Sequence, residues 1–248
     1  SLLGLLPLAF SLPARAQDKP YEARLFSAGF DGTRHMGGLH LRLAPGWKTY
    51  WRVPGEGGIP PVIEAKGVNV GEFSFDCPLP HRMTGGDGET IGYKDEVVFP
   101  WSLTPADAAR PVEVTVSAFI GVCQTICIPV PAEADFTLPP AVMATRETAL
   151  LAQWQALVPR QQVLVTKAMA GEENGKVFLE LGLNSAAADI FVEGSSLHFF
   201  ASPLWGDERR TARLAVYGAK SADELRGTDL RITADVNGAG LEQSVTVS

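Results

Sequence analysis

The sequence has no excess of basic residues and none of the short motifs that mark common hydrolases and nucleotidases. Its 248 residues contain 21 lysine and arginine residues against 28 aspartate and glutamate residues, a formal net charge of −7. A nucleic-acid surface needs a basic face, so this balance argues against nucleic acid as a partner. No G-x-S-x-G, H-E-x-x-H or phosphate-loop pattern occurs. The sequence therefore does not indicate a serine hydrolase of that type, a zinc peptidase or a P-loop nucleotidase.

Long apolar runs are also missing beyond the first residues. Leu2 to Leu12 is a short apolar run, and Ala14-Arg15-Ala16 follows it as an A-x-A cleavage pattern, so we expect residues 1–16 to be a signal peptide remnant. The competing interpretation, a buried amino-terminal helix, is weakened by Pro7 and Pro13. No later stretch approaches the roughly 20 apolar residues that span a bilayer. We expect the remainder to be soluble in an extracytoplasmic space, the periplasm, where disulfides persist.

Short runs of alternating apolar and polar residues dominate the rest of the chain, separated by turns rich in glycine and proline. Such runs indicate an antiparallel sandwich or barrel. The segment "TRETALLAQWQALVPR" departs from this alternation, because its leucines and tryptophan recur at helical spacing. We therefore predict an all-β chain with two β-domains, residues 17–142 and 159–248, joined by a short helical connector at residues 143–158.

Cysteine is scarce, with three residues in all, and two of them stand close together in "GVCQTICIP". A disulfide between Cys123 and Cys127 would close a loop of about five residues, which stabilises a fold by only roughly 2 kcal/mol. Bridged Cα atoms lie about 4.4–6.8 Å apart, so the chain would have to turn sharply between the two cysteines. Labile and catalytic disulfides tend to be strained or exposed ones. The spacing therefore favours redox exchange over a purely structural bridge.

Two other interpretations of the cysteines compete with redox exchange. One is a structural staple that joins Cys77 to Cys123 or Cys127 and leaves one thiol unpaired. The other is a metal site, in which Cys77, Cys123 and Cys127, with His81 and Met83, supply soft ligands for Cu(I). The redox interpretation itself predicts a poorly activated pair, because no Lys, Arg or His lies within five residues of either cysteine. Such a pair would react when the activated thiolate of a partner docks.

Three blocks of sequence, taken together, resemble a known family. The blocks are "PGWKTYWRVPGEGGIPP" (Pro45 to Pro61), "PLPHRM…IGYKDEVVFP" (Pro78 to Pro100) and "VCQTICIP" (Val122 to Pro129). They resemble the N-terminal domain of the thiol:disulfide interchange protein DsbD, and most of all its ScsB-like (suppressor of copper sensitivity) branch. The second β-domain is similar to the tandem immunoglobulin-fold arrangement of that branch.

The resemblance implies two immunoglobulin-like β-sandwich domains and a periplasmic redox function without a cofactor. It implies that Cys123 and Cys127 relay electrons between a membrane donor and a periplasmic thioredoxin-fold partner. Cys127 would exchange with the partner, and Cys123 would resolve the mixed disulfide. Tyr50 and Trp51, in the "KTYWRVPG" block, are our candidates for shielding the pair. The chain carries no membrane-spanning or thioredoxin-like part, so we expect either a stand-alone relative with a separate membrane donor or the front of a longer protein.

Overall fold

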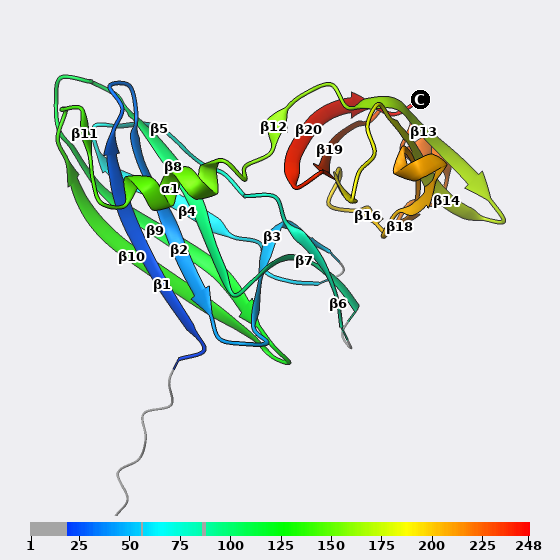
Figure 1. Cartoon of the computed structure of the whole chain (residues 1–248), viewed down its shortest axis with the longest axis horizontal. Coiled ribbons are helices and arrows are strands. Elements are labelled where there is room, and N and C mark those ends of the chain that lie inside the picture. Colours follow the sequence, from blue (N-terminus) through cyan, green and yellow to red (C-terminus); the bar gives the residue numbers. More distant parts are fainter. Residues whose placement is uncertain (1–18, 56, 86–87) are drawn as a thin grey trace, which may run out of the picture.

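The computed structural model describes residues 19–55, 57–85 and 88–248, and the expected signal remnant at residues 1–16 lies outside them. Figure 1 shows two groups of strands that follow one another along the chain, with the helix α1 (Thr148–Gln155) against the first. The predicted fold class is confirmed: the chain is all-β, with two immunoglobulin-like sandwich domains joined by a segment that contains this one α-helix of the described residues.

The first domain packs two antiparallel sheets. Its strands are β1 (Tyr21–Phe30), β2 (His35–Leu43), β3 (Lys48–Gly55), β4 (Val62–Val68), β5 (Val70–Phe75), β6 (His81–Gly85), β7 (Gly88–Lys94), β8 (Glu96–Pro105), β9 (Val112–Cys123), β10 (Cys127–Leu138) and β11 (Met143–Ala144). One sheet has the order β11-β1-β2-β8-β5. The other has the order β10-β9-β3-β7-β6, and β4 pairs with β9 as well. This second sheet carries the cysteine pair.

The second domain repeats the sandwich with shorter strands. They are β12 (Arg160–Gln161), β13 (Val165–Glu173), β14 (Lys176–Leu183), β15 (Asp189–Glu193), β16 (Phe199–Phe200), β17 (Leu204–Gly206), β18 (Thr211–Tyr217), β19 (Asp229–Val236) and β20 (Ala239–Thr246). One sheet has the order β12-β20-β19-β15, and the other has the order β13-β14-β18-β16, with β17 also paired to β18. Two short 3₁₀ turns, Asp207–Arg209 and Ala222–Glu224, complete the domain.

The alternating sequence explains the cores. In β9 the residues that point inward, from Val112 to Ile120, are buried, while the intervening ones are more exposed. Together with Trp51 and Trp101 they form the core between the two sheets of the first domain. A second, separate cluster fills the second sandwich. Each sandwich therefore has its own core, and Phe191 of the second domain joins the core of the first.

The connecting segment begins as a strand. In β11, Ala144 pairs with Gly29 of β1, and α1 follows. Leu151 of α1 is buried on the outer face of the first sheet, where it packs with Phe26 and Val98. The helix therefore covers the β1-β2-β8 face of the first domain.

Two arginines of the first domain bind the second domain. Arg82 forms ion pairs with Glu89 of its own domain and with Asp189, and its guanidinium donates to the Ile190 carbonyl oxygen at 2.6 Å. Arg52 forms an ion pair with Glu193 at 2.5 Å. These bonds and ion pairs hold β3 and β6 of the first sandwich against β15 of the second.

Candidate redox site

The cysteine pair closes the hairpin between β9 and β10. Cys123 is the last residue of β9, Cys127 is the first of β10, and the two are directly opposite each other in the register. Their sulfurs form a disulfide with a Cα–Cα distance of 4.1 Å. The three residues between them make the turn, in which the Gln124 amide donates to the Ile126 carbonyl oxygen at 3.4 Å. The sharp turn expected from the spacing is present, and the apolar, β-branched residues on both sides continue as strands.

The two cysteines differ in exposure. Cys123 is buried, with 2% of its surface exposed, because it lies within the sheet between β10 and β3. Cys127 is exposed at the start of the edge strand β10. Of the two cysteines, Cys127 is therefore the one that presents surface to solvent.

A row of four residues crosses this sheet in register, and we call it the cysteine row: Cys127, Cys123, Lys48 and Lys94. Directly opposite residues on antiparallel neighbours point to the same face, so these four side chains share one face of the sheet. Tyr50 lies two positions after Lys48 in β3 and points to that face as well. Its hydroxyl oxygen is 3.1 Å from the Cys127 sulfur.

Tyr50 is held under the loop between β3 and β4. Only 2% of the residue is exposed. A Cβ atom on Gly58 of this loop would lie 2.4 Å from the Tyr50 ring, and Gly58 has a φ of 148°. A Cβ atom on Gly121, on the sheet side, would lie 3.2 Å from the ring and 2.6 Å from Ile59. The two glycines therefore let the loop and the sheet close on the ring, which brings its hydroxyl to Cys127.

Trp51 lies apart from the disulfide. It is fully buried in the first core, its ring centroid is 5.7 Å from that of Phe191 in the second domain, and the Arg52 guanidinium lies 4.3 Å from its centroid. Adjacent residues of a strand point to opposite faces, which explains why Tyr50 reaches the sulfur and its neighbour does not. Of the two residues expected to shield the pair, the structure brings Tyr50 to it and places Trp51 at the domain junction.

Cys77 is a free thiol in the core of the first domain, with 4% of its surface exposed. Burial raises the pKa of this thiol to about 12. A structural bridge from Cys77 to Cys123 or Cys127 is a wrong interpretation, because Cys123 and Cys127 are bonded to each other and Cys77 is free. The described residues contain no group of three or more His, Cys, Asp or Glu side chains that could hold a metal ion, so Cys77 is not assembled with the pair. Of the other ligand candidates, Met83 is buried and His81 is exposed at the start of β6.

Sequence reasoning missed Lys48. The local sequence around the cysteines holds no cation, but β3 brings Lys48 directly opposite Cys123. The signal available in the sequence was the alternation in "WKTYWR", which puts Lys48 and Tyr50 on one face of a strand. The register with β9, which adds Cys123 to that face, is a long-range property.

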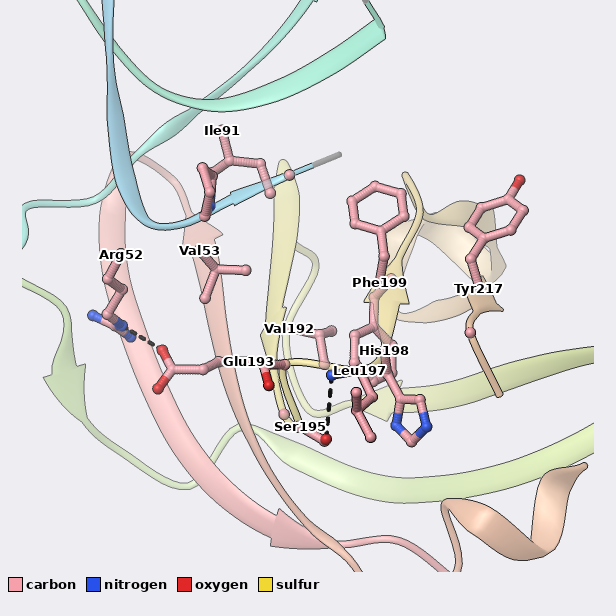
Figure 2. A pocket seen from close by; sticks show the side chains of 16 residues that line it. Arg52, Val53, Ile91, Val192, Glu193, Ser195, Leu197, His198, Phe199 and Tyr217 are labelled. Carbon is pink, nitrogen blue, oxygen red and sulfur yellow. Dashed lines mark hydrogen bonds and ion pairs between the residues drawn. The ribbon is translucent and has the colours of Figure 1, made fainter. Parts of the chain in front are cut away.

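A cavity of about 630 Å³ lies at the domain junction. Figure 2 shows that Val53 and Ile91 contribute to it from the first domain, and Leu197 and Phe199 from the second. Arg52 lines it too, but its guanidinium is already bound to Glu193. None of the lining residues is a cysteine, so this cavity is distinct from the disulfide.

No helix within the described part of the chain combines the length and the apolar character needed to cross a membrane.

Residues 17–139 match the family described as thiol:disulfide interchange protein DsbD, N-terminal. Among solved structures, the chain is similar to the crystal structure of the N-terminal periplasmic domain of ScsB from Proteus mirabilis, with a TM-score of 0.75 and 22% sequence identity. That match covers 95% of this chain and 96% of the other, so the fold of both domains is shared. No curated protein matches the chain.

Proposed function

Because this chain belongs, through residues 17–139, to the DsbD N-terminal domain family, we propose that it exchanges disulfides in the periplasm through Cys123 and Cys127. In this proposal the pair relays electrons between a membrane donor and a thioredoxin-fold partner. The family supports thiol–disulfide exchange, and the similar ScsB structure is described as a periplasmic domain.

The observation that carries the proposal is a disulfide at the tip of a hairpin with one exposed and one buried cysteine. A partner thiolate attacks the Cys127 sulfur, the bond to Cys123 breaks, and Cys123 leaves as a thiolate with the bonding electron pair. A second thiol of the partner, once deprotonated, attacks the partner's own sulfur in the mixed disulfide and releases Cys127 as a thiolate. The partner dithiol is oxidised to a disulfide, and the pair is reduced by two electrons. The reverse sequence passes these electrons to an oxidised partner.

Two neighbours of Cys127 support selective exchange with proteins. Tyr50 and the loop above it cover one side of the sulfur, so we assign this tyrosine the shielding role. Ile126, in the turn beside Cys127, is 75% exposed and offers an apolar contact to a docking partner. Trp51 receives no shielding role, because it packs against the second domain.

The test compares electron donors on purified oxidised protein. A reduced thioredoxin-fold protein should reduce the pair much faster than a small dithiol at equal thiolate concentration, because docking brings its thiolate to a shielded sulfur. Cys127→Ser should abolish the reaction, and Cys77→Ser should leave both rates unchanged. Equal rates for the two donors, together with tight Cu(I) binding that depends on Cys77, would overturn the proposal in favour of a copper site.

A further inference from the structure

Lys48 is a half-buried lysine on β3, the strand next to the one that ends in the buried Cys123. It is directly opposite Cys123 in the register, and directly opposite pairs have Cβ atoms about 4.5–5.5 Å apart. Its ammonium group donates to the Thr90 hydroxyl oxygen at 3.0 Å. That hydroxyl is buried and donates its own hydrogen to the Met83 carbonyl oxygen at 3.3 Å. The ammonium is therefore anchored by an uncharged acceptor.

The charge of Lys48 is not neutralised by any carboxylate that the structure describes, since none forms an ion pair with it within 4.0 Å. The other charged groups of β3 and β7 are either exposed or bound elsewhere. Lys94, next in the cysteine row, is exposed. Arg52 is bound to Glu193 and Glu242, and Glu89 is bound to Arg82. Among the described residues, Lys48 is therefore a cation whose side chain starts directly opposite Cys123 and which no carboxylate holds at Thr90.

The exchange reaction needs such a charge. When the disulfide opens at Cys127, the electron pair of the broken bond leaves on the Cys123 sulfur, which is almost fully buried. A buried thiolate is costly, and a nearby cation reduces that cost. A more stable leaving thiolate departs faster. We propose that Lys48 stabilises the thiolate that Cys123 becomes, and this inference rests on the proposed exchange function.

A direct measurement is a titration that does not depend on any partner. In a Cys127→Ser protein, thiolate absorbance followed against pH reports the ionisation of Cys123, because Cys77 stays protonated until the pH nears its own pKa of about 12. Lys48→Met should move the midpoint of the curve upward by about one pH unit, which is a tenfold change in the ionisation constant. Lys48→Arg should restore the original midpoint. Lys94→Met, in the same row but one strand further away and exposed, should leave it unchanged.

A second neutral variant separates charge from packing. Lys48→Gln offers a hydrogen-bond donor to Thr90 without the charge, so it should shift the curve as Lys48→Met does. In the protein with both cysteines, either neutral variant should slow reduction by a thioredoxin-fold donor roughly three- to tenfold, and Lys48→Arg should not. An unshifted titration in both neutral variants would overturn the role of Lys48. A protein whose titration shifts but which shows no preference for a protein donor would instead contradict the proposed function.

Discussion

At the scale of single residues, the site depends on the different surroundings of two bonded sulfurs. Cys127 is exposed and touches the Tyr50 hydroxyl, while Cys123 is buried beside Lys48. In the proposed exchange, a partner attacks the Cys127 sulfur, and the negative charge that then forms on Cys123 must be stabilised. The third cysteine, Cys77, is a free thiol in the core with a pKa raised by burial, and the proposed exchange does not use it.

The raised pKa of Cys77 predicts a pH dependence of stability. In the folded protein the thiol stays protonated up to about pH 12, whereas the unfolded chain loses this proton near its ordinary pKa of 9.0. The unfolded state therefore binds fewer protons above pH 9, and the free energy of unfolding should fall as the pH rises from 9.0 toward 12.

In a Cys123→Ala/Cys127→Ala protein, disulfide exchange cannot occur during unfolding. Urea unfolding of this protein should show the free energy of unfolding falling at alkaline pH. The same background with Cys77→Ser should lack the Cys77 contribution, so above pH 9.0 the unfolding free energy of the protein that retains Cys77 should fall relative to that of the Ser variant. Parallel curves over that range would mean that the Cys77 thiol ionises as readily in the fold as outside it.

At the scale of elements, β3 links the redox site to the rest of the molecule. Its odd and even positions face different structures: Tyr50 is directed to the disulfide, and Trp51 to the core and Phe191. The loop that follows β3 returns over Tyr50 at Gly58 and Ile59. One strand and its loop therefore supply residues that lie over the Cys127 sulfur.

Because the loop after β3 packs on Tyr50 at Gly58, a change at Gly58 should alter how easily a small reductant reaches the disulfide. A Cβ at Gly58 would clash with the Tyr50 ring, and the φ of 148° disfavours any other residue. Gly58→Ala should lift the loop from Tyr50 and speed reduction by a small dithiol several-fold. Gly57→Ala is the matched control, because a Cβ at Gly57 meets nothing within 4 Å. If both variants react with the small dithiol at the wild-type rate, the loop does not shield the pair.

The strands, the helix of the connector and the sharp turn could be predicted from the sequence, whereas the pairing of distant strands could not. Alternation gave the strands and a helical segment in the connector, because burial of one face is a local pattern. The four-residue spacing of Cys123 and Cys127 required a sharp turn, which the hairpin provides. We expected Tyr50 and Trp51 together to shield the pair, but adjacent strand residues point to opposite faces, and of these two the structure brings Tyr50 to the sulfur. Lys48 could not be found this way, because pairing of β3 with β9 depends on strands more than 70 positions apart.

At the scale of the whole molecule, the two sandwiches are joined by charged side chains as well as by the chain. Arg82 is 13% exposed, and it binds Asp189 and the Ile190 carbonyl of the second domain together with Glu89 of its own. Its guanidinium also lies 5.2 Å from the centroid of the Phe191 ring. Neither sequence alternation nor motif spacing could reveal Asp189 and Ile190 as partners of Arg82, since they lie in the other domain.

Removal of Arg82 should therefore weaken the junction. Arg82→Ala leaves two partly buried carboxylates without their cation, which should cost about 2–3 kcal/mol. We expect thermal unfolding to separate into two transitions, one for each domain. Arg226→Ala is the control, because its ion pair with Asp223 is exposed and should contribute less than about 0.5 kcal/mol. A single transition at the wild-type temperature in Arg82→Ala would show that other contacts hold the domains together.

The most direct test of the account concerns which sulfur a partner attacks. Cys123→Ser and Cys127→Ser proteins each keep one member of the pair, which is activated as a mixed disulfide with a small aromatic thiol. A thioredoxin-fold protein with only its attacking cysteine is then added, and mass spectrometry follows the covalent complex and the released aromatic thiol. We expect rapid formation of the complex through Cys127 in the Cys123→Ser protein and little or none through Cys123 in the Cys127→Ser protein. Equal rates in the two proteins, or faster reaction at Cys123, would contradict it.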